Sequence, residues 1–220
     1  LDVDTASDVI LELSDSSREQ IIEDLSNEKL TDIIEEMESD DRADIIAELS
    51  DDQAKAVLDA IEPAESEEVK ELLSYPEDTA GGIMQSELVS VSRTATINDA
   101  FQAVASAKDE IENINNIFVV DEEERLVGTV PLQSLITTRR FTPVVDVIDR
   151  DIPSVPVDMD QEEVARLFNK YDLVSVGVVD SENRLLGRIT IDDIMDTVQE
   201  ETSEDIYRIA GLGQDDTVFN

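Results

Sequence analysis

Histidine, cysteine and tryptophan are absent from this 220-residue chain, and aromatic residues make up only 4% of it. Without histidine or cysteine there can be no Ser-His-Asp or Cys-His catalytic system, no thiolate chemistry and no typical zinc site. Positive charge is also scarce, since 16 Lys and Arg stand against 55 Asp and Glu, which gives a formal net charge of −39. We therefore expect neither nucleic acid nor lipid head groups as partners, because both are bound largely through cationic side chains.

What the chain has in quantity is carboxylate oxygen, the ligand that Mg²⁺ and Ca²⁺ prefer. Apolar residues make up 40% of the sequence, enough to bury one or two cores in a chain of this length. No run of about 18 apolar residues is present, so we expect no segment that spans a bilayer. The chain begins at Leu1 and ends on Val218-Phe219-Asn220, which suggests an excised piece of a longer protein.

The first 62 residues repeat with a period of 12. Apolar residues eight, nine and twelve positions apart fall on one face of a short helix, so the pattern predicts short helices stacked in a superhelix. Three of the four units open with a serine at the expected N-cap, and Gln53 follows Ser50 by three residues as a capping box. The units open at Leu13-Ser14, Leu25-Ser26, Met37-Glu38 and Leu49-Ser50 and close at Ile21-Ile22, Ile33-Ile34, Ile45-Ile46 and Val57-Leu58.

A second, longer repeat follows Ala80-Gly81-Gly82. Phe118–Gly128 corresponds to Gly177–Gly187 at an offset of 59 residues. Each copy is predicted to contain a short strand, an amphipathic helix (97–107 or 161–171), a strand hairpin and a last helix (132–137 or 191–198). The fold class is therefore α+β, an all-α superhelical repeat followed by two β-α-β-β-α units that pack on each other through their sheets.

The sequence resembles a known family in two places. The β-α-β-β-α unit that ends in Gly187–Asp193, of the form Gly-x-x-Thr-x-x-Asp, resembles a CBS domain. The segment Tyr75–Met84 resembles the junction of the MgtE family of magnesium channels, in which an acidic helical domain precedes a CBS pair.

This resemblance implies an acidic helical domain over residues 1–77, truncated at its start, CBS domains over 78–143 and 144–199, and the start of a connecting, or plug, helix over 200–220. It also implies a homodimer, a covalently continuous membrane channel domain beyond residue 220, and a place on the cytoplasmic face of the cell membrane.

By the same resemblance, the family's regulatory magnesium ligands fall on residues of both parts of the chain. In the helical domain, Asp40 and Asp44 are four residues apart and share one helix face. The remaining positions belong to the second CBS repeat and to the connecting helix. The implied set is Asp8, Asp40, Asp44, Glu162, Asn169 through its backbone carbonyl, Asp172, Asp193, Asp196, Glu201, Glu204 and Asp205.

An adenine nucleotide, ATP or AMP, is the second ligand to consider, since CBS pairs often hold one with Thr and Asp on the ribose. Thr190 and Asp193 keep that pattern, whereas the first repeat has Pro131 and Ser134 in their places. The alternative for Thr190 and Asp193 is an ordinary helix start. We favour a cap or a metal ligand over a nucleotide ligand.

The leading hypothesis is a cytosolic Mg²⁺ sensor that gates a channel. Mg²⁺ would bridge the acidic helical domain, the CBS pair and the connecting helix and hold the pore shut, and loss of Mg²⁺ would release it. A nucleotide-sensing CBS module with incidental acidity is the alternative, and an acidic protein of a high-salt cell is a third. An enzyme is least favoured, because neither repeat offers a recognisable nucleophile and base.

Overall fold

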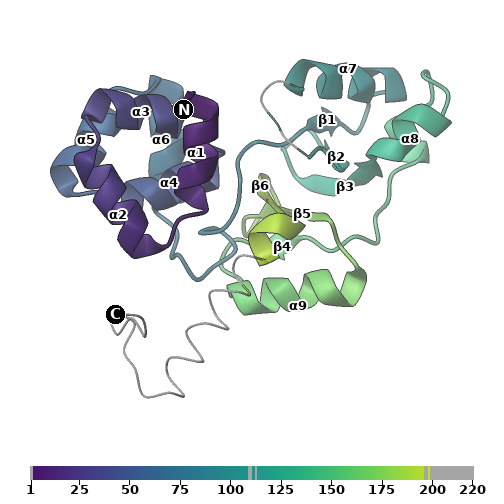
Figure 1. The fold of residues 1–220 in the computed structure, drawn as a ribbon. Helices are drawn as coiled ribbons and strands as arrows, with labels where there is room; N and C mark the ends of the chain where they lie inside the picture. Colours follow the sequence, from purple (N-terminus) through teal and green to yellow (C-terminus); the bar gives the residue numbers. More distant parts are fainter. Residues whose placement is uncertain (1, 109–110, 112, 196–197, 199–220) are drawn as a thin grey trace.

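The computed structural model describes residues 2–108, 111, 113–195 and 198. An all-helical domain lies beside two smaller units that combine helices and strands (Figure 1). This arrangement confirms the predicted α+β class with its helical first part. No helix in the described part of the chain is long and apolar enough to cross a membrane.

Six short helices form the first domain and are arranged in a ring (Figure 1). Helices two apart in sequence pack together, α1 on α3, α3 on α5 and α4 on α6, as expected for stacked units that cannot bury their apolar faces alone. They are α1 (Val3–Leu11), α2 (Asp15–Asp24), α3 (Asn27–Glu35), α4 (Ser39–Glu48), α5 (Asp51–Leu58) and α6 (Pro63–Leu72).

The serines of the 12-residue repeat stand at the predicted N-cap positions but do not cap. Ser14, Ser26 and Ser50 precede α2, α3 and α5 with extended backbone angles, and none of their side chains makes a capping hydrogen bond. Ser50 Oγ instead donates to Gln53 Oε1 at 2.8 Å. The helix starts are therefore as predicted, whereas the predicted capping box at Ser50 is wrong, because its hydroxyl bonds a side chain in place of a backbone N–H.

Each of the two following units, here called the first and second repeat, has a three-stranded sheet in which a parallel pair is followed by an antiparallel pair. The first repeat contains β1 (Ser90–Ser92), α7 (Ile97–Ala107), β2 (Asn116–Val120), β3 (Leu126–Pro131), α8 (Leu132–Thr137) and a 3₁₀ turn, η1 (Val144–Asp146). The second contains β4 (Val155–Pro156), α9 (Gln161–Tyr171), β5 (Ser175–Val179) and β6 (Leu185–Thr190), and residues 191–195 after β6 are helical.

The hairpins of the two repeats have the same register. Val119 pairs with Gly128 in the first and Val178 with Gly187 in the second, which confirms the offset of 59 residues. The two sheets also contact each other, as predicted. A Cβ on Gly177 would lie 3.0 Å from the Phe118 ring, so the absence of a side chain there lets the sheets approach closely.

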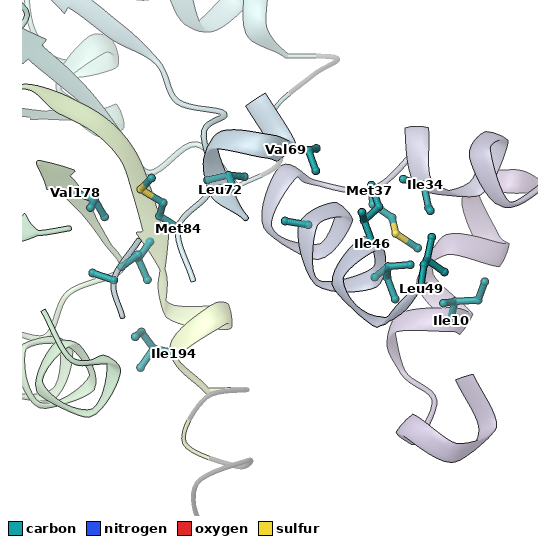
Figure 2. Close-up of a cluster of buried hydrophobic side chains, with 14 of the residues drawn as sticks. Ile10, Ile34, Met37, Ile46, Leu49, Val69, Leu72, Met84, Val178 and Ile194 are labelled. Atoms are coloured by element: carbon teal, nitrogen blue, oxygen red, sulfur yellow. The ribbon is translucent and has the colours of Figure 1, made fainter. Parts of the chain in front are cut away.

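The helical domain and the second repeat share one buried apolar cluster, whereas the first repeat has its own. Figure 2 shows this shared core passing from Ile34 and Met37 through Leu72 and Met84 to Val178. Burial of this apolar surface is the main force that holds the helical domain against the second repeat.

The glycines of the junction permit a close approach of backbones. Ala80 N and Gly81 N donate to Met159 O and Val157 O at 2.7 and 2.9 Å, which ties the junction to the second repeat. A Cβ on Gly81 would lie 2.6 Å from the Tyr75 ring, so a larger residue would force the junction out. The junction motif therefore has a packing function.

Candidate functional site

The segment that joins the helical domain to the first strand, residues 79–89, contacts the helical domain and the second repeat; we call it the junction segment. Gln85 and Arg188 of β6 exchange two backbone hydrogen bonds, both 2.8 Å long. At the start of α4, Ser39 Oγ donates to Glu87 Oε2 at 2.6 Å and accepts from Ser86 N at 2.9 Å. We call the contact among α4, the junction segment and the second repeat the docking interface.

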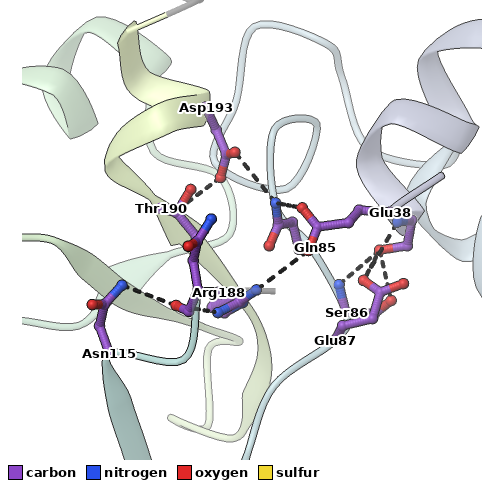
Figure 3. A network of polar contacts seen from close by, with 10 residues as sticks. Glu38, Gln85, Ser86, Glu87, Asn115, Arg188, Thr190 and Asp193 are labelled. Carbon is purple, nitrogen blue, oxygen red and sulfur yellow. Dashed lines mark hydrogen bonds and ion pairs between the residues drawn. The ribbon is translucent and has the colours of Figure 1, made fainter. Parts of the chain in front are cut away.

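A polar network crosses the docking interface (Figure 3). Gln85 Nε2 donates to Glu38 Oε2 at 2.9 Å and to Asp193 Oδ1 at 3.3 Å. Arg188 Nη2 lies 3.6 Å from Glu38 Oε1. The network therefore connects the helical domain to the end of β6 and to the helical turn that follows it.

Asp40 is the most deeply buried carboxylate of this interface. It is 8% exposed, and its Oδ1 has no hydrogen-bond partner. Burial raises the pKa of Asp40 well above its ordinary value, and the charges of Asp193, Asp41 and Glu38 raise it further. A buried carboxylate without a counter-charge is costly, so this site favours either a proton or a cation.

Two neighbouring carboxylates are perturbed in the same direction. Burial raises the pKa of Glu38 from 4.5 to about 7, against the lowering effect of Arg188. Burial also raises the pKa of Asp193, although its hydrogen bonds to Thr190 and the charge of Arg188 partly oppose the shift. The structure thus brings together Asp40 and Asp193, two of the predicted metal ligands from opposite ends of the chain.

Asp44 lies elsewhere on α4, at an open cavity of about 650 Å³ between the helical domain and the second repeat. Glu12, Asp41 and Glu48 of the helical domain line the same cavity, as does Arg18, which pairs with Glu48. Gln161 at the start of α9 lines it from the second repeat. The position of Asp44 is therefore compatible with an ion shared across this gap.

The other predicted ligands in the described part of the chain are exposed. Asp8 lies on α1, and Glu162 at the start of α9 forms an ion pair with Arg166. Asn169 and Asp172 lie toward the other end of α9, about 10 and 15 Å from Glu162 by the helical rise, so they cannot share an ion with Glu162. The predicted ligands Asp196, Glu201, Glu204 and Asp205 lie outside the described residues.

Across residues 2–108, 111, 113–195 and 198, no group of three or more carboxylates is arranged to hold a metal ion by itself. The chemistry available is that of a two-carboxylate site. Mg²⁺ suits it, because Mg²⁺ keeps most of its waters and is commonly bound through one or two carboxylates. The orphaned Oδ1 of Asp40 and the carboxylate of Asp193, whose charge acts on Asp40, are the oxygen ligands that such a site would use.

Thr190 and Asp193 form the helix start that we weighed against a nucleotide site. Thr190 N donates to Asp193 Oδ2 at 2.7 Å, and the Thr190 side chain is buried. In the first repeat, Pro131 precedes α8 without a side-chain cap. The bond between Thr190 and Asp193 is the Asp193 half of a capping box, in which the carboxylate three residues into the helix accepts from the Thr190 backbone N–H.

Sequence reasoning missed three residues of the network, Glu38, Gln85 and Arg188. For two of them, a departure from an internal repeat in the sequence could have indicated the site. Glu38 stands where the other units of the 12-residue repeat have serine, and Arg188 stands where the first repeat has Thr129. Each is a charged departure from an internal repeat, and the two meet in the structure.

Family models match nearly the whole chain. The model of the MgtE intracellular N domain matches residues 1–78, and the model of the CBS domain matches residues 80–140 and 144–200.

Curated relatives agree with these matches. The chain is 38% identical to the magnesium transporter MgtE of Thermus thermophilus over 162 residues, which is 74% of this chain and 36% of that protein. It is 37% identical to the MgtE of Enterococcus faecalis over 156 residues, 71% of this chain and 34% of that protein. The chain spans about a third of the length of these relatives. Its similarity to the inosine-5'-monophosphate dehydrogenase of Methanocaldococcus jannaschii, 29% over 117 residues, arises through the CBS domains.

Two solved structures share the whole arrangement. The soluble part of a magnesium transporter superposes with a TM-score of 0.84 at 32% identity and covers 91% of this chain and 79% of its own. The cytosolic domain of the Mg²⁺ channel MgtE in complex with ATP gives the same TM-score at 35% identity and covers 88% and 79%. These matches agree with the sequence resemblance and with the observed order of domains. The chain belongs to the MgtE family of magnesium transporters, with the helical N domain and the tandem CBS domains of that family.

Proposed function

We propose that this chain is a cytosolic Mg²⁺-sensing region of a magnesium transporter, in which Mg²⁺ stabilises the docking interface. The observation that carries the proposal is the buried pair Asp40 and Asp193, with an orphaned oxygen on Asp40. The chain's similarity to the soluble part of a magnesium transporter and to the cytosolic domain of the Mg²⁺ channel MgtE supports the choice of ion.

The electrostatics support a metal-dependent contact. Both domains are acidic, and Glu38, Asp40 and Asp193 repel one another across the docking interface when they are ionised, which is one cause of the raised pKa of Glu38 and Asp40. A divalent cation among them offsets this repulsion and replaces the lost hydration of Asp40. Because the ion binds the docked state better than the undocked state, it shifts the population toward docking.

Regulation follows from this shift. At high Mg²⁺ the helical domain stays on the second CBS domain, and the connecting helix keeps the pore closed; at low Mg²⁺ the domains separate and the helix is released. Asp44, which lines the cavity, and Glu162, which follows the cavity-lining Gln161 in sequence, are further bridging candidates, as are Asp8, Asn169 and Asp172. The ligands proposed for the connecting-helix contact are Asp196, Glu201, Glu204 and Asp205.

Small-angle scattering tests the proposal on the 220-residue chain, in chelator and in saturating Mg²⁺ at constant ionic strength. We expect the wild-type chain to be compact with Mg²⁺ and extended with chelator. The double variant Asp40→Asn/Asp193→Asn removes the proposed ligands, so its compactness should not depend on Mg²⁺.

The matched control is Asp59→Asn/Asp158→Asn, which removes one exposed carboxylate from each of the same two domains. It should respond to Mg²⁺ as the wild-type chain does. Equal compactness of the wild-type chain with Mg²⁺ and with chelator would refute the proposal. A normal response of Asp40→Asn/Asp193→Asn would show that the ion binds elsewhere.

Adenine nucleotide is the second ligand that we propose, supported by the ATP complex of a similar domain and by the position of Thr190 and Asp193. Equilibrium dialysis with ATP and AMP, with and without Mg²⁺, tests it. Binding that is lost in Thr190→Val would support a ribose contact. No binding of either nucleotide would leave Thr190 and Asp193 with the helix start alone.

The proposed assembly is a homodimer continuous with a membrane channel domain. Two copies would place two connecting helices beside one pore. Sedimentation equilibrium of the 220-residue chain tests the dimer, and a monomer at all concentrations would contradict it.

A further inference from the structure

Arg188 is a positive charge buried in a strand of the acidic docking interface. Its side chain is 4% exposed, and Nη2 lies 3.6 Å from Glu38 Oε1. On another side, Nη1 donates to Asn113 O of the first CBS domain at 3.5 Å. The guanidinium therefore contacts the helical domain and the first CBS domain from a strand of the second (Figure 3).

The internal repeat shows that this charge is specific to the docked copy. Arg188 pairs with Gly177 in the second hairpin, as Thr129 pairs with Phe118 in the first. The helical domain shares its core with the second CBS domain only, and the arginine occurs in that domain. A guanidinium is costly to bury without a carboxylate, so its burial here depends on the acidic side chains that surround it.

The surrounding charges respond to Arg188. Its positive charge acts on two carboxylates from different domains, Glu38 and Asp193, and lowers the pKa of both against the effect of burial. Glu38, in turn, lies at the start of α4, so a force on Glu38 acts on the helix that carries Asp40 and Asp44.

We propose that Arg188 is a positioning residue for docking, a fixed cation of the second CBS domain that holds Glu38 and so reduces the amount of divalent cation that docking requires. The expected effect of Arg188 on the Mg²⁺ requirement rests on the proposed function. Its expected effect on docking in the absence of metal rests on the ion-pair geometry alone. The inference goes beyond metal binding, because the chain itself supplies part of the charge neutralisation.

The test compares two single variants of the 220-residue chain, Arg188→Met and Arg184→Met. Arg184 is a matched control, because it lies in the same hairpin and its charge pairs with Asp180 and Glu182 in the exposed turn. Scattering is followed from chelator to saturating Mg²⁺ at constant ionic strength. We expect the Mg²⁺ midpoint of Arg188→Met to rise about tenfold, within the range usual for coupled sites, and that of Arg184→Met to stay within about twofold of wild type.

A rescue variant separates charge from packing. In Arg188→Met/Glu38→Gln the carboxylate that needs the counter-charge is gone, so the midpoint should return to within about threefold of wild type. Glu38→Gln alone also favours docking, so it completes the cycle: it should lower the midpoint more when residue 188 is methionine than when it is arginine. An arginine that only fills space, or only bonds Asn113, would give the same lowering in both backgrounds. Arg188→Gln, which keeps a donor for the Asn113 carbonyl, should behave as Arg188→Met does and replaces it if circular dichroism shows that the methionine variant is unfolded.

Two outcomes overturn the inference: a midpoint of Arg188→Met equal to that of Arg184→Met, or a raised midpoint that Glu38→Gln lowers no more than it lowers the midpoint of the wild-type chain. A failure of the proposed function gives a different result from a failure of this inference. If wild-type compactness does not respond to Mg²⁺, the sensing function fails, and compactness in chelator still tests Arg188. In chelator, a more open Arg188→Met that Glu38→Gln restores by more than it compacts the wild-type chain supports the ion pair, and an equal effect of Glu38→Gln in both backgrounds overturns it.

Discussion

Glu38→Gln should make docking of the helical domain tighter at alkaline pH and less dependent on pH. Burial raises the pKa of Glu38 from 4.5 to about 7, despite the nearby Arg188. The docked state therefore favours the neutral acid. Stability from this group is fully present below about pH 4.5 and is lost as the pH rises through about 7. Glutamine, which is neutral at every pH, removes that loss.

The magnitude follows from the size of the shift. At about 1.36 kcal/mol for each pKa unit, a change from 4.5 to about 7 corresponds to about 3.4 kcal/mol. The Glu38 side chain is 30% exposed, so solvent screening reduces this figure to about 1.5 kcal/mol. We therefore expect docking of Glu38→Gln to be about tenfold more favourable than that of the wild-type chain at pH about 8, and about equal near pH 5.

Fluorescence energy transfer between the two domains measures this equilibrium. Because the chain has no cysteine, dyes can be attached at Glu28→Cys and Asp158→Cys, both exposed and in different domains. The titration is done in chelator, so that metal does not contribute. Glu36→Gln, which removes an exposed carboxylate two residues away, is the control and should follow the wild-type curve.

The prediction is tested by the difference in docking between the wild-type chain and Glu38→Gln as the pH changes. Asp40 and Asp193 also have a raised pKa, so both curves should fall as the pH rises, and only their separation belongs to Glu38. Parallel curves, or weaker docking of Glu38→Gln at pH about 8, would refute the reasoning, because the attraction of Arg188 would then outweigh the cost of burial.

Three further predictions concern the scaffold of the site. Gly187→Ala would place a Cβ 2.5 Å from Gln85 O, so it should displace the junction segment and weaken docking in the same fluorescence assay, without a change of charge. Phe168→Ala should lower the free energy of unfolding in urea by about 3–5 kcal/mol, because the side chain is 1% exposed in the shared core; a loss below about 1 kcal/mol would contradict that burial. Asp180→Asn should lower the melting temperature at pH 7, because hydrogen bonds from the Arg184 backbone and side chain lower the pKa of Asp180 from 3.8. That stability is present above about pH 3.8 and is lost as the pH falls through the lowered pKa, so the two melting curves should converge in acid and remain apart at neutral pH.

The sequence alone determined the local elements and their repetition. The 12-residue period placed the helix starts at Ser14, Ser26 and Ser50, and the offset of 59 residues placed the two hairpins in the same register. These features depend on periodicity within a few turns or strands, which the order of apolar residues fixes. The family resemblance added the order of the domains and a ligand set that includes Asp40 and Asp193.

Only the tertiary structure showed that Glu38 and Asp40 meet Arg188 and Asp193. Their proximity depends on how the junction segment packs, with Met84 in the shared core and Gln85 paired to β6. The side-chain hydrogen bonds of the serines at the N-cap positions likewise could not be predicted from their spacing, because a hydroxyl has several partners within reach. Burial of a charge is a property of the packed domains, since desolvation arises only when two surfaces close on it. For that reason the sequence determined that the chain is acidic, and the fold decided which carboxylates are buried together, where either a proton or a cation offsets the cost of burial.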